Sequence, residues 1–168
     1  MEEVGPDGTV LRVVTRGEMR AGHLRHRCVY LVVIGGDDRL LVHRRSPDKD
    51  VWPGRWDVAA GGVVAAGEAW DDAARRELAE ELGLRGVELE PLGGGTFDDD
   101  DVHVTGRCYL VRSDGPFQFD DGEVVEARFV TPGDLAELRS SEDFCPDSLA
   151  LALEHVWPSG RAEVEPAR

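Results

Sequence analysis

Three glutamates lie close together in the segment GGVVAAGEAWDDAARRELAEELGL, which runs from Gly61 to Leu84. On a helix, which turns by about 100° per residue, Glu81 lies about 40° to one side of Glu77 and Glu80 lies about 60° to the other. The neighbouring helix face is apolar and carries Ala74, Leu78 and Leu82. Like charges at these spacings cost only about 0.2–0.5 kcal/mol per pair, so an ordinary solvent-exposed face is one interpretation. Clustered carboxylates also suit a hard divalent cation, which prefers oxygen ligands.

The residues around these glutamates follow a fixed spacing. The positions are Gly62, Glu68, Arg76, Glu77, Leu78, Glu80, Glu81, Gly83 and Leu84. They match every fixed position of the pattern G-x5-E-x7-R-E-U-x-E-E-x-G-U, in which U is a bulky aliphatic residue. The fixed letters would coincide by chance roughly once in 10⁷ windows of this composition. The segment 62–84 therefore resembles the signature of the Nudix (MutT-like) hydrolases.

This resemblance implies a metal-dependent enzyme. Nudix hydrolases use Mg²⁺ or Mn²⁺ to cleave a nucleoside diphosphate linked to another moiety, X. The cation neutralises the diphosphate, polarises a phosphoryl oxygen and lowers the pKa of a bound water. By resemblance, Glu77 and Glu81 are metal ligands, and Glu80 is a third ligand or the residue that positions or deprotonates water. Arg76 orients a neighbouring glutamate through a charge-assisted hydrogen bond.

The resemblance also implies supporting roles for residues near this helix. Glu68 pairs across the loop and holds the helix. The carbonyl of Gly61 is a metal ligand, and Gly61 and Gly62 permit a close approach of the backbone. A further family ligand usually lies just before the last core strand, where Glu123 in DDGEVVEARF is the candidate. A solvated turn residue is an equally good interpretation of Glu123.

Other residues are candidates for substrate contact. Arg44 and Arg45, at the end of an expected strand, could bind a substrate phosphate or pair with nearby acids. Trp52 and Trp56 could stack on a base or pack on the core. The acidic run 98–101 could bind a second cation, but a solvated turn between two strands is the better interpretation. No residue identifies X.

A looser resemblance extends beyond the signature. The stretch LRHRCVYLVVIGGDDRLLVHRRSPDKDVWPGRWD and the acidic DDGEVVEARFVTPGDLAEL are similar to segments of isopentenyl-diphosphate isomerases and their hydrolase relatives. The isomerases need a Cys-Gly-His run where this chain has Gly61-Gly62-Val63. Their R-E-U-x-E-E part is also degenerate, whereas that part is intact here. His26 matches one isomerase-like position but is better interpreted as a strand-edge residue. An isomerase is therefore the alternative to a hydrolase of this branch.

A non-catalytic, ligand-sensing Nudix module is a second alternative. Such modules typically lose glutamates of the signature, whereas this chain keeps all of them. Catalysis is therefore the first prediction.

Composition favours one soluble domain that acts on a small diphosphate substrate. The 168 residues are 41% hydrophobic and 32% charged, which allows a single core. A formal charge of −15 argues against a nucleic-acid partner, and no apolar run has the length of a membrane span. The acidic start lacks a signal segment and the three cysteines form no C-x-x-C pair, so we expect a cytoplasmic protein. Family members are often dimers, so the resemblance allows a homodimer.

The pattern of apolar and turn residues predicts the elements that position these side chains. We expect strands at 9–15, 28–34, 39–45, 55–62, 87–97, 102–112 and 126–130. We expect helices at 69–82 and 148–157 and a short helix that begins at Thr131. Residues 16–26 are expected to be a surface connection, and residues from about 159 to 168 a frayed tail. Strands around one central helix, with more helix at the end, predict an α/β fold. We expect a single domain over 1–168, a Nudix-type α/β/α sandwich with a mixed β-sheet.

Overall fold

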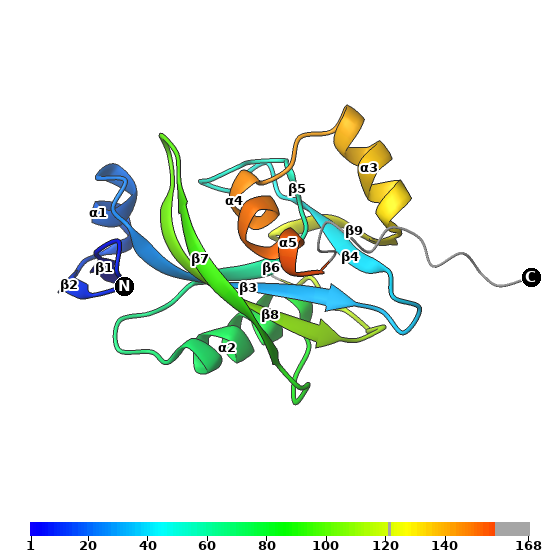
Figure 1. The fold of residues 1–168 in the computed structure, drawn as a ribbon, viewed down its shortest axis with the longest axis horizontal. Coiled ribbons are helices and arrows are strands. Elements are labelled where there is room, and N and C mark those ends of the chain that lie inside the picture. The colour runs from blue at the N-terminus through cyan, green and yellow to red at the C-terminus, as the bar shows by residue number, and fades with distance from the viewer. Residues whose placement is uncertain (121, 157–168) are drawn as a thin grey trace, which may run out of the picture.

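The computed structural model describes residues 1–120 and 122–156. In this part of the chain the strands form one sheet with helices on both of its faces (Figure 1). The strands are β1 (Glu2–Val4), β2 (Val10–Val13), β3 (His26–Ile34), β4 (Leu40–Arg45), β5 (Trp56–Asp57), β6 (Ala60–Val63), β7 (Glu90–Asp98), β8 (His103–Arg112) and β9 (Val124–Val130). The helices are α1 (Arg16–Ala21), α2 (Trp70–Leu82), α3 (Pro132–Ser141), α4 (Pro146–Ser148), the π-helical η1 (Leu149–Leu153) and α5 (Glu154–Val156).

Strand β3 is the centre of the sheet. It pairs antiparallel with β1, β4 and β6, and parallel with β8 from His26–Val104 to Ile34–Arg112. Beyond these neighbours, β7 pairs with β8 and β9 pairs with β4. The predicted mixed sheet is therefore confirmed.

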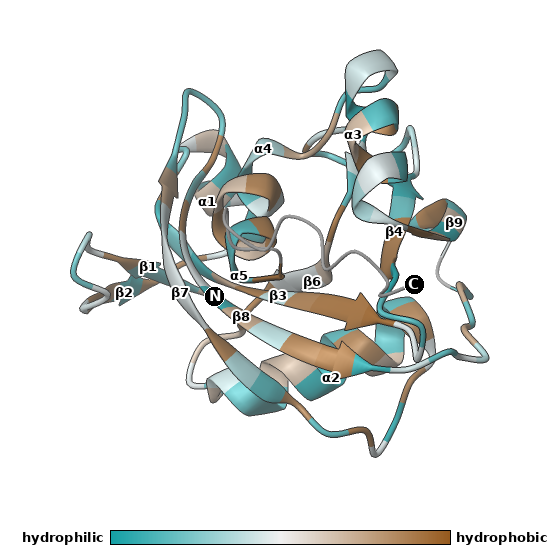
Figure 2. Ribbon diagram, turned by 45° about the vertical axis from the view of Figure 1, so that its right-hand side comes forward, coloured by the Kyte–Doolittle hydropathy of each residue, from teal (hydrophilic) through white to brown (hydrophobic). Residues whose placement is uncertain are grey.

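Alternate residues of β3 point to opposite faces of the sheet. Val29, Leu31 and Val33 pack with α2 on one face. Tyr30 and Val32 pack with η1 and α3 on the other face. Hydrophobic residues run along β3 and β8, between these two helical layers (Figure 2). The predicted α/β/α sandwich, with α2 and the C-terminal helices on opposite faces, is confirmed.

The helix that carries the signature glutamates forms as predicted. Its apolar face is buried through Ala73, Ala74, Leu78 and Leu82. It ends at Gly83, whose φ of 68° lies in the left-handed region that glycine adopts most easily,. Gln118 fixes this end, because its backbone N–H donates to the carbonyl of Leu82 at 3.0 Å.

The N-terminal part of the chain differs from the prediction. Residues 16–21, expected to belong to a surface connection, form α1. Thr15 and Glu18 make a capping box, in which the Glu18 N–H donates to Thr15 Oγ1 at 3.2 Å and the Thr15 N–H donates to Glu18 at 2.8 Å,. Met19 packs into the core with 1% of its surface exposed. One buried side chain and a cap thus stabilise a helix too short to show an apolar period.

The C-terminal helix also differs. It begins at Pro146 rather than at residue 148, and it includes the π-helical turn η1. Trp157 and the predicted frayed tail lie outside the described residues. No helix within residues 1–120 and 122–156 is long and apolar enough to cross a membrane.

Candidate active site

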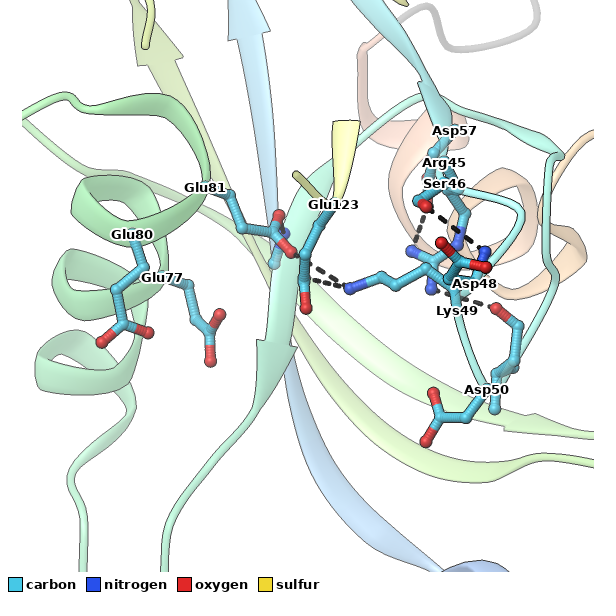
Figure 3. Close-up of polar contacts among 12 residues, drawn as sticks. Arg45, Ser46, Asp48, Lys49, Asp50, Asp57, Glu77, Glu80, Glu81 and Glu123 are labelled. Carbon is cyan, nitrogen blue, oxygen red and sulfur yellow. Dashed lines mark hydrogen bonds and ion pairs between the residues drawn. The ribbon is translucent and has the colours of Figure 1, made fainter. Parts of the chain in front are cut away.

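A cavity of about 560 Å³ lies beside α2. On one side it is bounded by the glutamates of α2 and the glycines of β6, and on the other side by the loop 46–55 and the N-terminal segment. Figure 3 shows Glu77, Glu80 and Glu81 on the α2 side, with Lys49 reaching toward Glu81 and Glu123 from the loop. The structure thus brings all of the predicted metal-binding glutamates to one cavity.

Glu77 and Glu81 are buried against the two glycines of β6. They are 9% and 5% exposed, whereas the side chain of Glu80 is 57% exposed. The Gly61 N–H donates to Glu81 Oε2 at 2.8 Å. A Cβ atom on Gly62 would lie 2.6 Å from Glu77 Oε1, and one on Gly61, whose φ is 148°, would lie 2.0 Å from the Val29 carbonyl oxygen. Gly62 therefore leaves the space that the Glu77 carboxylate occupies, and Gly61 lets β6 pass close to the backbone of β3,.

Arg76 joins the loop before α2 to the glutamates of the helix. Its guanidinium donates to Glu68 at 2.9 and 3.0 Å, to Glu77 Oε1 at 2.5 Å and to Glu80 Oε2 at 3.1 Å. It also donates to the carbonyl of Val63 at 3.2 Å. Glu68 in turn accepts from the Ala65 N–H at 2.8 Å. One arginine therefore contacts both the loop before α2 and two glutamates of the helix.

Burial changes the proton affinity of these carboxylates. It raises the pKa of Glu81 to about 8, although the Gly61 N–H and the charge of Lys49 act in the opposite direction. Burial also raises the pKa of Glu77, against the effect of Arg76. By contrast, the hydrogen bonds from Arg76 lower the pKa of Glu68. The folded protein therefore disfavours the charged forms of Glu77 and Glu81,.

Glu123 lies directly before β9, at the position expected for a further ligand. Its carboxylate contacts the ammonium of Lys49, whose Nζ lies 3.9 Å from Glu81 Oε1. Burial alone would raise the pKa of Glu123, but the hydrogen bond and charge of Lys49 bring it below its ordinary value. The structure thus places Glu123 at the cavity near Glu81, in the loop before β9 and with 41% of its side chain exposed.

This donor set suits a hard divalent cation. It contains the carboxylates of Glu77, Glu81 and Glu123 and the carbonyl of Gly61, all of them oxygen donors,. Among the described residues, no three carboxylate, imidazole or thiol side chains already stand close enough to hold a metal. The reason is visible in the contacts, since Arg76 holds Glu77 while Lys49 holds Glu123 and faces Glu81. An incoming cation would have to replace these contacts.

A family model matches most of this chain. The model of the NUDIX domain matches residues 24–147, which is most of the chain. The chain belongs to the Nudix hydrolase family.

Relatives of this Nudix hydrolase cover nearly its whole length. It is 41% identical over 165 residues to the Nudix hydrolase YfcD of Salmonella typhi, which is described as uncharacterized; the alignment spans 98% of this chain and 87% of the relative. It is 42% identical over 163 residues to YfcD of Escherichia coli strain K12, over 96% of this chain and 88% of that one. The predicted likeness to isopentenyl-diphosphate isomerases is not confirmed.

Solved structures share the fold. DR0079 from Deinococcus radiodurans aligns with a TM-score of 0.74 at 27% identity, covering 87% of this chain and 92% of that chain. The NUDIX domain of Shewanella oneidensis NrtR, complexed with ADP ribose, aligns with a TM-score of 0.61 at 19% identity, covering 82% and 94%. At that identity the second comparison shows the fold alone.

The structure separates the two arginines predicted to bind substrate in this Nudix hydrolase. Arg45 lines the cavity, where it donates to the Val51 carbonyl at 3.1 Å and lies 3.5 Å from Asp57. Arg44 lies outside this cavity, in a small polar hollow, and donates to the Gly54 carbonyl at 3.0 Å. Successive strand residues face opposite ways, so Arg45 remains a candidate for phosphate binding at this cavity, whereas Arg44 does not line it.

The other candidates predicted from the sequence also differ in whether they line the cavity. Trp52 lines the cavity, whereas Trp56 is a core residue with 2% exposure. His26, expected at a strand edge, is buried in β3 and lines the cavity wall. In the acidic run, Asp99 accepts from the Asp101 and Val102 N–H groups, which makes the run a turn between β7 and β8.

Several cavity residues were not predicted from the sequence. Lys49 is the most important, because it contacts a predicted ligand. In the cavity lining, Tyr30 donates to the half-buried Asp147 at 2.9 Å. Asp147 and Tyr30 are 117 positions apart in the sequence, so only the folded chain brings them together. For Lys49 a signal existed, since it is the only lysine of the chain.

Proposed function

We propose that this Nudix hydrolase uses Mg²⁺ or Mn²⁺ to hydrolyse a diphosphate bond in a nucleoside diphosphate-linked substrate. The observation that carries the proposal is the burial of Glu77 and Glu81 beside the glycines of β6. A purely solvated acidic face would leave these side chains exposed, as Glu80 is. Buried carboxylates need compensating positive charge, which a divalent cation bound between them would supply.

The proposed ligands are Glu77, Glu81, Glu123 and the carbonyl oxygen of Gly61. Bound there, the cation would neutralise the diphosphate, polarise a phosphoryl oxygen and lower the pKa of the attacking water. Glu80, which reaches the cavity with an exposed carboxylate, would complete the ligand set or position and deprotonate that water. Arg76 orients Glu77 and Glu80. Glu68 holds the loop before α2 against Arg76, and Gly62 leaves space for the Glu77 carboxylate.

The substrate side of the cavity is cationic and aromatic. Arg45 lines it, and the Arg45 Nε–H is buried without a hydrogen-bond partner in the described structure. We assign Arg45 to a substrate phosphate. Trp52 offers a ring at the same cavity, which suits a base or another flat group of X,. A volume of about 560 Å³ falls within the range of small-molecule sites.

The wider assignment follows the same reasoning. We propose one catalytic domain over residues 1–168 that acts in the cytoplasm on a small diphosphate, without a nucleic-acid or membrane partner. The formal charge of −15 supports the exclusion of nucleic acid,. A homodimer is the assembly to test first, and sedimentation equilibrium of the full chain tests it.

The experiment that tests the reaction is a screen of diphosphates with and without Mg²⁺ or Mn²⁺. The panel contains ADP-ribose, dinucleoside polyphosphates, NADH, coenzyme A and prenyl diphosphates, with identification of the products. We expect metal-dependent cleavage between two phosphorus atoms. Hydrolysis that is indifferent to chelation of divalent cations would overturn the proposal.

The same screen tests the two alternatives. The run Gly61-Gly62-Val63 offers no thiol or imidazole at the place where the isomerases need them. Conversion of isopentenyl diphosphate to its allylic isomer would nevertheless establish the isomerase. Tight binding of a nucleotide with no turnover under any metal condition would establish the ligand-sensing module.

A further inference from the structure

The ammonium of Lys49 lies among the carboxylates at the proposed cation site. It contacts the Glu123 carboxylate, and its Nζ lies 3.9 Å from Glu81 Oε1 (Figure 3). The Lys49 side chain is only 14% exposed, and Glu81 is 7% exposed. A lysine at the surface of an acidic protein can pair with many partners, but this one reaches inward to two acids, one in α2 and one in the loop before β9.

The backbone that carries Lys49 is fixed from both sides. Before it, the Ser46 N–H donates to the Glu123 carbonyl at 2.8 Å, and the Lys49 N–H donates to the Ser46 carbonyl at 3.2 Å. After it, Asp50 accepts from Arg16 at 3.2 Å and from Arg20 at 3.0 Å, which ties the loop to α1. The long aliphatic stem of Lys49 is therefore the part that can move, while its point of attachment stays at the cavity.

We propose that Lys49 is an internal counter-ion that holds Glu81 and Glu123 in place of a divalent cation and is displaced into the cavity when the cation binds. The inference rests on the proposed function, because it requires the cation site. Its physical basis is that one pair of carboxylates cannot hold an ammonium and a divalent cation at contact distance without strong repulsion between the two cations. Lys49 would thus stabilise the metal-free protein and weaken its affinity for metal.

The test compares metal binding by the wild type and by Lys49→Met, which keeps the stem and removes the charge. Isothermal titration calorimetry at one fixed pH should show that Lys49→Met binds Mn²⁺ about tenfold more tightly than the wild type does. A factor of this size is usual for the coupling between two binding events. Without metal, Lys49→Met should unfold at a lower temperature than the wild type. Arg16→Met is the matched control, because Arg16 lines the same cavity but pairs with Asp50, which Arg20 still ties to α1 at 3.0 Å. Its affinity for Mn²⁺ should stay close to that of the wild type.

A second measurement uses the unchanged protein. Because Lys49 is the only lysine, labelling with ¹⁵N-lysine gives a single side-chain Nζ resonance. Saturation with Mg²⁺ should move that resonance, since the ammonium leaves Glu81 and Glu123. This measurement decides the question even where Lys49→Met fails to fold.

Three outcomes would overturn the inference. If Lys49→Met binds Mn²⁺ no more tightly than the wild type, or if Arg16→Met gains as much affinity, contact with the carboxylates is not what weakens binding. If the Nζ resonance does not move on saturation with Mg²⁺, no displacement occurs. Each of these results leaves the proposed function intact as long as turnover depends on metal. Failure of the wild type to bind either metal would overturn both.

Discussion

The carboxylate of Glu68 accepts two hydrogen bonds from the guanidinium of Arg76, at 2.9 and 3.0 Å. Glu68 lies in the loop before α2 and Arg76 lies within the helix, so the contact fixes the glycine loop against the carboxylates. Glu68→Gln removes the charge and one of the two acceptor oxygens. We expect it to destabilise the protein by about 1–2 kcal/mol and to lower Tm by about 2–8 °C, with a milder loss of rate.

Thermal unfolding of Glu68→Gln beside Glu88→Gln measures this effect. Glu88 is an exposed residue, and its substitution should leave Tm unchanged. A Glu68→Gln variant as stable as the wild type, yet inactive, would assign Glu68 to the chemistry instead of to the loop.

Replacement of a proposed metal ligand should have the opposite effects on stability and turnover. Because burial raises the pKa of Glu77, its charged form is disfavoured in the folded protein, and Glu77→Gln should keep or slightly raise the metal-free stability. It should abolish turnover. At a Mg²⁺ concentration 100 times Kd the wild type should gain about 2.7 kcal/mol, and Glu77→Gln should gain clearly less.

Thermal unfolding of the wild type, Glu77→Gln and Glu137→Gln over a Mg²⁺ titration makes the comparison. Glu137 is exposed on α3 and should shift with metal as the wild type does. Identical shifts for the wild type and Glu77→Gln would place the cation elsewhere.

Gly62→Ala tests whether the Glu77 carboxylate needs the space left by Gly62. The added Cβ would lie 2.6–2.7 Å from three atoms of the Glu77 carboxyl group, so the carboxylate has to move away. We expect a metal affinity about tenfold or more below that of the wild type, measured by calorimetry. In Gly17→Ala the nearest atom to the new Cβ is Thr15 Oγ1 at 4.0 Å, and metal binding should be unaffected. Wild-type affinity in Gly62→Ala would show that Glu77 need not lie against β6.

Arg45 and Arg44 form a natural pair for testing phosphate binding. Arg45→Gln should raise KM for the best substrate by about tenfold, equivalent to about 1.4 kcal/mol of lost binding, with a smaller effect on kcat. Arg44→Gln, one residue away but outside the cavity, should change KM little. Steady-state kinetics of both folded variants distinguishes the two positions, and equal effects would contradict the assignment of Arg45.

His26 should make the stability depend on acid pH. Burial lowers its pKa from 6.5 to about 4, against the hydrogen bond to the Leu24 carbonyl; Arg20, Arg16 and His103 add smaller lowering effects. The unfolded chain therefore binds more protons than the folded one between these values, and stability falls as the pH drops from about 6.5 toward 4. The loss due to His26 is at most about 3 kcal/mol.

Urea unfolding at several pH values should give a shallower acid decline for His26→Gln than for the wild type. His155→Gln, at an exposed position, should retain the wild-type slope. An unchanged slope in His26→Gln would mean that other groups cause the decline.

The sequence predicted the signature helix and its surroundings well because the signals there are local. The apolar spacing of α2 and the stop at Gly83 depend on residues within a few turns of each other. The burial of Glu77 and Glu81, in contrast to Glu80, was not predictable, because it depends on where β6 passes the helix. Alternation along β4 predicts that Arg44 and Arg45 diverge, but only the packed fold tells which of them faces the cavity. The position of Lys49 depends on ties between its loop, α1 and Glu123, all distant in the sequence.

The cavity wall contributed by Met1, Arg16 and Arg20 comes from residues that precede the matched NUDIX domain, which begins at residue 24. The carboxylates and glycines proposed for the chemistry all lie inside that domain. Arg45 and Trp52, proposed to contact the substrate, also lie inside the matched domain, so residues 1–23 complete the cavity without supplying those contacts. A chimaera that takes residues 1–23 from a relative should therefore alter the shape of the cavity entrance while leaving the residues proposed for the reaction unchanged.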